Sequence, residues 1–382
     1  MRQPDRVSIV SVYAVRRRSA ASNTQGGHVT GKRFLLRAVA LLALAALVAA
    51  AGAAARTGRA GGPAAKQATV KVALVTDIGG LNDRGFNHLS YVGLQQAQKK
   101  LKINGRVFIT QTANDRTPNL RSAAQQGYGL VIPVGVLFEF GPLDDVAPAF
   151  PNTKFAGVDV QWSGLTKKPA NVRGIQFKEQ EAGYLVGYIA GLVIKRHPYK
   201  GKQVVSGVGA NKVPAIVRYL AGFQAGAKKA DPKATVLINY ANDPTFADQA
   251  KCKETTLNQI QRGSGIAFEA AGACGLGGLD AAKQQGAWGI GVDADQGFLG
   301  KHILTSALKN VSLSVYQAIA AYKANPSGFK GGFDKTYSVK NNGVGYGKLS
   351  TKLSKADRAF ITKKVAVVKK QIASGKIKPP SQ

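Results

Sequence analysis

The amino-acid sequence predicts an α/β protein with two lobes, each built on a parallel sheet. From Val70 onward, short β-type runs alternate with helical stretches, which is the pattern of parallel strands joined by helical crossovers. At 382 residues the chain exceeds one ordinary core, and eight such units would overfill a single open sheet. A short internal repeat also supports two lobes. Gly-Val-Asp occurs in 154–160 (KFAGVDV) and again in 288–294 (WGIGVDA), each time at the fourth predicted strand of one half of the chain.

The first element along the chain is a leader. The stretch 31–58 has a basic start, an apolar run from Ala38 and small residues at 51–55, which is typical of a secretory signal. Its apolar run is only marginally long enough to span a bilayer, so a retained anchor is the alternative. Residues 1–28 lie upstream of any normal signal, and we expect Val29 to be the initiator. Because no cysteine lies near the cleavage region, we expect export to the periplasm or the outer face of the cell membrane, without a lipoprotein anchor.

Eight strand candidates follow a linker that ends at residue 69, and helical patterns such as FNHLSYVGLQQAQKKL separate them. The candidates are Val70–Thr76, Arg106–Gln111, Leu130–Val134, Lys154–Val158, Gln203–Val208, Thr235–Asn239, Ile266–Ala271 and Trp288–Val292. We expect 70–174 with about 294–322 to form lobe 1. We expect 175–293 with about 323–382 to form lobe 2.

The chain is strongly basic, with a formal net charge of +33. Residues 1–59 hold ten Lys/Arg against one Asp, so +9 lies in the leader and +24 remains afterwards. Such a charge raises nucleic acid as a partner. However, the basic residues are spread along the chain, and no helix-turn-helix, zinc finger or RNP strand accompanies them. We therefore expect no nucleic-acid binding, a solvated basic helix near the C-terminus, and a surface able to adhere to anionic lipid or wall polymer.

The chain has two cysteines, Cys252 and Cys274. Cys252 falls near the start of a predicted helix, and Cys274 follows the end of the next predicted strand. In a parallel sheet both points lie on the same rim, so a disulfide is geometrically reasonable in an exported protein. Two small buried thiols are the alternative.

The sequence contains few motifs that are typical of enzymes. The four histidines show no metal-binding spacing, and neither a GxxxxGK[ST] phosphate loop nor a Gly-x-Ser-x-Gly elbow occurs. The glycine-rich stretch GACGLGG (272–278) could cradle an anion, but a tight turn is the simpler interpretation. We therefore expect a binding protein that uses no metal or cofactor, and a secreted α/β enzyme is the alternative from another class.

Polar and aromatic groups gather at the predicted strand ends. Four strands end in residues that can face a ligand, and two helices begin with a phenylalanine; these residues are Asp77, Asp159, Gly272, Asp293, Phe86 and Phe246. Carboxyl ends of strands are the edge where open α/β sheets bind ligands. Phenylalanine rings stack on flat heterocycles, and buried carboxylates accept hydroxyl or N–H donors. This combination fits a nucleoside.

Several segments together resemble the basic membrane protein (BMP) family of ABC-transporter substrate-binding proteins, of the purine nucleoside receptor type. They are VALVTDIGGLNDRGFN, EQEAGYLVGYIAG, VPAIVRYLAGFQAG, AFEAAGACGLGGLDAAKQQG, IGVDADQ and LTSALKNV, and they run in the family's order from about Val70 to the C-terminus. The resemblance implies a type I, class B periplasmic-binding fold, in which two Rossmann-like lobes joined by three hinge strands close on a ligand. It also implies an ABC permease as a partner and a monomeric binding protein.

The resemblance assigns roles to individual residues. Phe86 and Phe246 match the two phenylalanines between which the base lies in the family, and Asp77 and Asp159 would face the base. Gly272 would line the cleft through its backbone.

On the sugar side, Asp293 of GVDADQ and Lys309 of TSALKN would hold the ribose hydroxyls. The chain departs from the family at Gly85, where a serine is usual, and in lacking the usual lipid-anchor cysteine. Sugars and small signalling molecules are the alternative ligands.

Four residues also have a purely structural interpretation. Asp83 is expected to cap the following helix rather than to bind ligand, because Asp commonly precedes helices for this purpose. Phe86 could belong to the core, Asp77 could form a turn, and Lys309, if it lay on a helix, would ordinarily be solvated.

Overall fold

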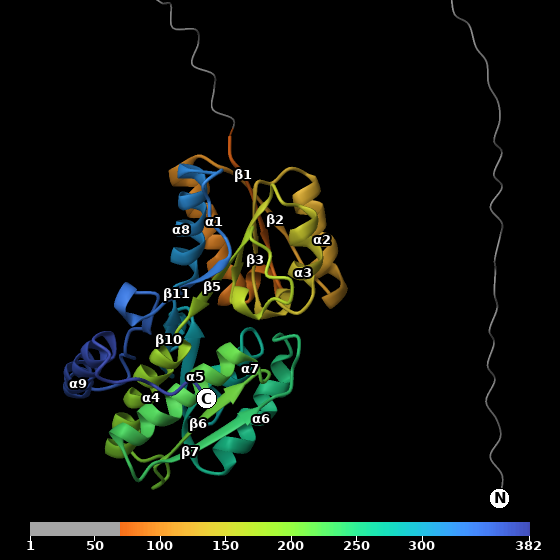
Figure 1. Ribbon diagram of the computed structural model, residues 1–382. Helices are drawn as coiled ribbons and strands as arrows, with labels where there is room; N and C mark the ends of the chain where they lie inside the picture. Colours follow the sequence, from red (N-terminus) through yellow and green to blue (C-terminus); the bar gives the residue numbers. More distant parts are fainter. Residues whose placement is uncertain (1–68) are drawn as a thin grey trace, which may run out of the picture. The chain divides into compact units, whose positions relative to one another are not determined.

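A computed structural model describes residues 69–382, and Figure 1 shows their arrangement. The predicted signal segment, the initiator at Val29 and the expected cleavage region lie outside the described residues. Within 69–382, no helix is long and apolar enough to cross a membrane.

The first sheet has six parallel strands in the order β11-β5-β4-β3-β1-β2. They are β1 (Lys71–Val75), β2 (Asn104–Phe108), β3 (Leu130–Pro133), β4 (Lys154–Val158), β5 (Val172–Phe177) and β11 (Phe333–Tyr337). Strands β1, β3 and β4 are almost wholly buried apolar runs, as expected for a parallel sheet covered on both faces. In Figure 1 the helices α1 (Phe86–Leu101) and α8 (Val311–Ala324) cover one face, and α2 (Arg116–Gln125) and α3 (Pro142–Val146) cover the other.

The second sheet repeats this order as β12-β10-β9-β8-β6-β7, except that β12 runs antiparallel to β10. Its strands are β6 (Val204–Gly209), β7 (Thr235–Tyr240), β8 (Ser264–Ala270), β9 (Trp288–Asp293), β10 (Ile303–Lys309) and β12 (Val344–Tyr346). Its helices are α4 (Glu179–Arg196), α5 (Pro214–Ala230), α6 (Gln249–Gln261), α7 (Gly275–Gln284) and α9 (Lys355–Ala373). The predicted two-lobe α/β fold is therefore confirmed.

The glycines of α4 and α5 bring these two helices into backbone contact. A Cβ on Gly183, Gly187 or Gly191 would collide with the backbone of α5, and one on Gly222 or Gly226 would collide with the backbone of α4. Only glycine allows helix backbones to approach this closely. The contact fixes the position of α5, whose first turns reach the edge of the sheet.

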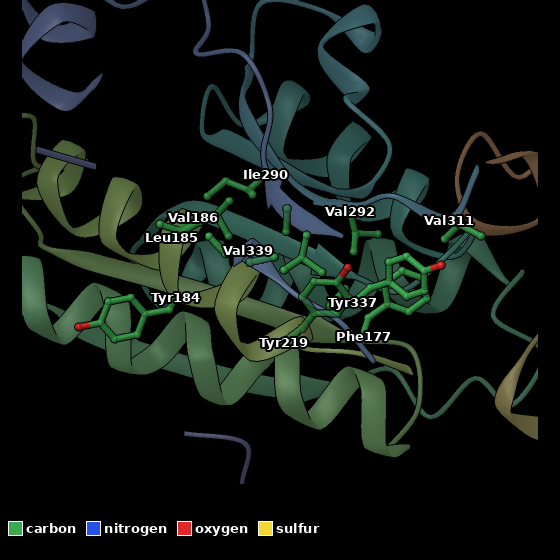
Figure 2. Packing of buried hydrophobic residues seen from close by; sticks show 14 of the residues in the cluster. Phe177, Tyr184, Leu185, Val186, Tyr219, Ile290, Val292, Val311, Tyr337 and Val339 are labelled. Carbon is green, nitrogen blue, oxygen red and sulfur yellow. The ribbon is translucent and has the colours of Figure 1, made fainter. Parts of the chain in front are cut away.

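The chain passes between the sheets three times: from β5 into α4, from β10 into α8, and from β11 to β12. Phe177 and Tyr337, which end β5 and β11, stack with ring centroids 5.4 Å apart, and Figure 2 shows the two rings side by side. At the same place the Lys178 N–H donates to the carbonyl of Tyr337 (2.8 Å). Two of the crossings are thus tied together.

The strand order differs from the predicted lobe boundaries. The sequence predicts that about 294–322 belongs to lobe 1, but β10 pairs with β9 in the second sheet. It also predicts that about 323–382 belongs to lobe 2, but β11 pairs with β5 in the first sheet. Hydrophobic patterns identify a strand but not its neighbours, which explains the difference. We therefore propose the division 70–177 with 310–337 for lobe 1, and the rest of 178–382 for lobe 2.

Candidate functional site

A cavity lies at the carboxyl edges of the two sheets, and residues from both lobes line it. In each sheet the strand order reverses at its first strand, the topological switch point at which open α/β sheets bind ligands. All seven residues predicted as ligand-binding line this cavity: Asp77, Phe86, Asp159, Phe246, Gly272, Asp293 and Lys309. The tertiary structure thus brings together residues that are spread over more than 230 positions of the sequence.

Asp77, just beyond the end of β1, is engaged by a cation that the sequence did not indicate. Its carboxylate accepts hydrogen bonds from Arg116 Nε (2.9 Å) and from its neighbour Ile78 N (2.8 Å), and Arg116 Nη2 lies 2.7 Å away. Burial raises the pKa of Asp77, and the Arg116 guanidinium offsets part of that rise. Asp77 therefore lines the cavity with a carboxylate whose orientation is fixed. One of its oxygens is already bonded to Arg116 and Ile78.

Asp159 and Asp293, the two aspartates of the Gly-Val-Asp repeat, occupy corresponding positions at the ends of β4 and β9. Both have left-handed backbone conformations, with φ of 60° and 62°. Such strain in non-glycine residues is tolerated where the surrounding structure enforces it, often at functional sites. Asp293 accepts a hydrogen bond from Tyr219 Oη (3.1 Å), and burial raises its pKa to about 7.

Lys309 is the last residue of β10 and is buried. A solvated helical position is therefore wrong for this residue. Its Nζ lies 2.6 Å from Asp159 Oδ2 and 2.9 Å from Glu179 Oε1, and 5.1 Å from the ring centroid of Phe86. Burial lowers the pKa of Lys309, but the carboxylates of Asp159, Glu179 and Asp293 together raise it above its usual range. Lys309 is thus a fixed ammonium group that joins the two lobes.

The second oxygen of Asp159 is a buried acceptor left unpaired within residues 69–382. Asp159 Oδ1 is buried and has no hydrogen-bond partner among the described residues, whereas Oδ2 binds Lys309. Burial raises the pKa of Asp159, although Lys309 lowers it in part. A buried acceptor without a partner is costly, so an N–H or O–H donor on a ligand would satisfy it.

Phe246 and Gly272 meet on the lobe 2 side of the cavity. Both have left-handed backbone conformations, each with φ of 59°. A Cβ on Gly272 would lie 3.3 Å from the carbonyl oxygen of Phe246, and the N–H of Cys274 donates to that same carbonyl (2.9 Å). The predicted Cys252–Cys274 disulfide is confirmed, with a Cα–Cα distance of 5.5 Å, and both cysteines are fully buried. The disulfide therefore joins α6 to the start of α7, next to the Phe246 carbonyl.

Besides Arg116, the sequence did not indicate three further residues near the cavity: Glu179, Arg218 and Tyr219. Glu179 begins α4, is fully buried and binds Arg218 Nε at 2.6 Å. Tyr219 lies next to Arg218 on α5 and points its hydroxyl at Asp293. The sequence predicts the helices that carry these residues. It does not predict which side of each helix lies near a cavity, because that depends on how the helices pack.

Asp83 behaves as the sequence predicts, because its carboxylate accepts backbone hydrogen bonds at the start of α1. It also lines the cavity. Asn87 is engaged locally, accepting from the N–H of Asp77 (3.1 Å) and donating to the carbonyl of Ile78. The described residues contain no group of His, Cys, Asp and Glu side chains suited to hold a metal ion.

Comparison with known proteins gives a consistent result. The family model for PnrA-like ABC transporter substrate-binding proteins (Bmp) matches residues 70–381. The ABC transporter nucleoside-binding protein BmpA of Lactococcus lactis subsp. cremoris is 32% identical over 346 residues, which cover 85% of this chain and 93% of that protein. Basic membrane protein A1 of Borrelia garinii subsp. bavariensis is 32% identical over 284 residues, covering 72% of this chain and 79% of its own length.

Solved structures show the same fold. An ABC transporter solute-binding protein from Aeropyrum pernix K1 superimposes with a TM-score of 0.71 at 25% identity, covering 82% of this chain and 94% of that one. A solute-binding protein from Conexibacter woesei has a TM-score of 0.62 at 23% identity, covering 82% of this chain and 99% of that one, and this likeness supports the fold alone. Some relatives, such as one from Pyrococcus furiosus that is 32% identical over 76% of this chain and 73% of its own length, are named lipoproteins.

Proposed function

The chain belongs to the family of PnrA-like ABC transporter substrate-binding proteins, and from this premise we propose that its ligand is a nucleoside, with a purine base. The resemblance indicated by the sequence motifs is therefore correct. Proteins of this family bind substrates for ABC transporters and are not enzymes. A small-molecule ligand and a permease partner follow from membership in the family.

The observation that carries the proposal is the pair of phenylalanines on opposite lobes of one cavity. Phe86 opens α1 in lobe 1 and Phe246 precedes α6 in lobe 2, and both line the cavity. Among the aromatic ring pairs of residues 69–382, none joins these two rings to each other. A flat base between them would gain roughly 1–3 kcal/mol from each stacked face.

The polar groups suit the edges of a nucleoside. Asp77 and the unpaired Oδ1 of Asp159 would accept N–H donors of the base. Asp293 and Lys309 would bind the ribose hydroxyls, since a carboxylate accepts from them and an ammonium donates to them. Gly272 would let the backbone approach the ligand closely, because it carries no side chain.

Binding would act through the two lobes. A ligand that contacts both lobes stabilises the closed arrangement and shifts the population towards it. The closed form would then be the one that docks on the permease, as a monomer.

Calorimetry of the mature chain against a panel of ligands tests the nucleoside proposal. The panel contains adenosine, guanosine, inosine, cytidine, uridine, the free bases, ribose and glucose. We expect purine nucleosides to bind most tightly, and Phe86→Ala to weaken that binding about tenfold or more through loss of stacking. Tightest binding of a sugar, or wild-type nucleoside affinity in Phe86→Ala, would contradict the proposal.

We also propose that the chain is exported through its leader and held at an anionic envelope surface by its basic charge, without a lipoprotein cysteine. The net charge of +24 beyond residue 59 supports this adhesion. Cell fractionation tests it: washing membranes with high salt should release the protein. An uncleaved chain that only detergent releases would instead indicate a retained membrane anchor.

A further inference from the structure

Two segments of the chain share the sequence Asn-Asp-x-x-Phe: 82–86 (NDRGF) and 242–246 (NDPTF). The first follows β1 in lobe 1, and the second follows β7 in lobe 2. Each segment ends with one of the two phenylalanines that line the cavity. The same five-residue pattern therefore supplies an aromatic ring from each side.

In the first segment, the carboxylate of Asp83 accepts three backbone hydrogen bonds. The donors are the N–H groups of Gly85 (3.0 Å), Asn87 (2.7 Å) and His88 (3.0 Å). These are the second, fourth and fifth residues after the aspartate. Phe86, the third residue, lies between bonded neighbours on both sides.

In the second segment, Asp243 repeats this arrangement. Its carboxylate accepts from the N–H groups of Thr245 (2.9 Å), Ala247 (2.8 Å) and Asp248 (2.8 Å), again the second, fourth and fifth residues. The Thr245 hydroxyl adds a fourth bond of 2.6 Å. Phe246 again lies between bonded neighbours.

Both aspartates are buried, with 4% of Asp83 and 1% of Asp243 exposed, and neither forms an ion pair with another described residue. The backbone N–H groups are therefore their main partners, and hydrogen bonds to an ionised acceptor are stronger than neutral ones. Burial opposes ionisation of Asp243, but its hydrogen bonds from Thr245, Asp248 and Ala247 outweigh this and lower its pKa.

Ordinary helix capping does not account for the second segment. The helix α6 begins at Gln249, three residues beyond Phe246, and has its own cap. The side chain of Asp248 accepts from the N–H groups of Ala250 (3.1 Å) and Lys251 (3.4 Å). Since α6 is already capped, the bonds to Asp243 serve the turn that carries Phe246.

We propose that Asp83 and Asp243 are positioning residues that fix the two phenylalanine rings at opposite walls of the cavity, ready to stack on a flat ligand ring. This inference rests on the proposed nucleoside-binding function. The entropy lost in ordering each turn is then lost when the protein folds and not when the ligand binds. A preorganised site gains affinity in this way.

A double-mutant cycle at Asp243 tests the inference, because this residue does not itself line the cavity. The variants are Asp243→Ala, Phe246→Ala and the double variant, titrated with the tightest-binding nucleoside of the panel. We expect Phe246→Ala to weaken binding about tenfold or more, and Asp243→Ala to weaken it roughly fivefold. Because positioning acts only through the ring, the double variant should bind within about twofold of Phe246→Ala.

Asp144 provides the matched control. It is also a buried aspartate, and it accepts the backbone N–H groups of Thr166 (2.9 Å) and Lys167 (2.8 Å), but it does not line the cavity. Asp144→Ala should lower the melting temperature and keep wild-type affinity. Asp243→Asn, which retains one acceptor oxygen, should bind with intermediate affinity and replaces Asp243→Ala if that variant does not fold.

Two outcomes would overturn the inference: wild-type affinity in a folded Asp243→Ala protein, or an equal loss of affinity with and without the Phe246 ring. If the wild type binds no nucleoside, the proposed function fails instead. Hydrogen exchange of the amides in 245–248 then decides the positioning role. Faster exchange in Asp243→Ala but not in Asp144→Ala supports it, and unchanged exchange refutes it.

Discussion

Lys309 pairs with the carboxylates of a charged cluster that borders the cavity. It is nearly inaccessible to solvent and lies between Asp159 of lobe 1 and Glu179 at the start of α4. Arg218 binds the other oxygen of Glu179. Buried charges are tolerated only when they are paired, and these four residues pair one another. Their geometry leaves Asp159 Oδ1 without a hydrogen-bond partner among the described residues.

The proposed contact of Asp293 with the ribose predicts that nucleoside binding depends on pH. Burial raises its pKa to about 7, although Lys309 lowers it in part. If the ionised carboxylate accepts the ribose hydroxyls, ligand selects the deprotonated form. Affinity should then be full above pH 7 and fall as the pH drops through that value, by roughly tenfold between pH 8 and pH 6.

Calorimetry at several pH values measures this dependence, and Asp293→Asn is the control because its amide does not titrate. The variant should bind more weakly than wild type and show a flat profile over the same range. An equal slope in both proteins would assign the pH dependence to another group.

At the scale of elements, the close contact between α4 and α5, which their glycines allow, positions the side chains that these helices bring to the site. Tyr219 and Arg218 lie on α5, and Glu179 begins α4, so the distance between these helices decides whether the three side chains meet their partners. The disulfide has a similar effect near Phe246, since it links α6 to the start of α7, where the N–H of Cys274 donates to the Phe246 carbonyl.

Gly187→Ala should therefore weaken both stability and binding. The new Cβ would collide with the backbone of Phe223 and push α5 away from α4, since backbone cannot yield as a flexible side chain can. We expect a loss of about 1–3 kcal/mol in the free energy of unfolding, as for other overpacked sites, together with reduced nucleoside affinity.

Urea denaturation and calorimetry check this pair of effects. Gly345→Ala serves as the control, because a Cβ at Gly345 meets nothing within 4 Å. If Gly187→Ala is as stable as Gly345→Ala, the helices do not depend on this close approach.

At the scale of the whole described unit, the three crossings between the sheets form the axis about which lobes could open. Next to the β10 crossing, the buried ion pair of Lys309 and Asp159 (2.6 Å) joins the lobes, and other contacts near the cavity are weaker. Arg84 of lobe 1 lies over the ring of Phe298 of lobe 2, 5.8 Å from its centroid, and Gln296 Nε2 donates to the carbonyl of Arg84 (3.5 Å). Such weak contacts can separate without unfolding either lobe.

Small-angle X-ray scattering should therefore detect closure. We expect the ligand-free protein to populate open arrangements, so a saturating amount of the proposed nucleoside ligand should decrease the radius of gyration. Phe86→Ala at the same ligand concentration should show a smaller decrease if its site is not saturated. An unchanged radius, with binding proven by calorimetry, would mean that ligand enters an already closed protein.

The sequence by itself determined the elements whose cause is local. Alternating strand and helix patterns gave the α/β class, and polar residues directly after apolar runs identified Asp77, Asp159 and Asp293 as strand-end groups. The repeated Gly-Val-Asp predicted comparable positions for Asp159 and Asp293, and their left-handed backbone conformations do match. The repeated Asn-Asp-x-x-Phe was equally visible in the sequence, but its meaning depended on hydrogen bonds that only the fold revealed.

Only the tertiary structure decided which distant segments meet. Whether β10 joins the first or second sheet depends on pairing between strands, which hydrophobic periodicity does not encode. The same holds for Arg116 beside Asp77, which is 39 residues away, and for Lys309 beside Asp159, which is 150 residues away. Burial and charge pairing are properties of the packed chain, because a lysine takes its partner and its exposure from its neighbours in space rather than in sequence.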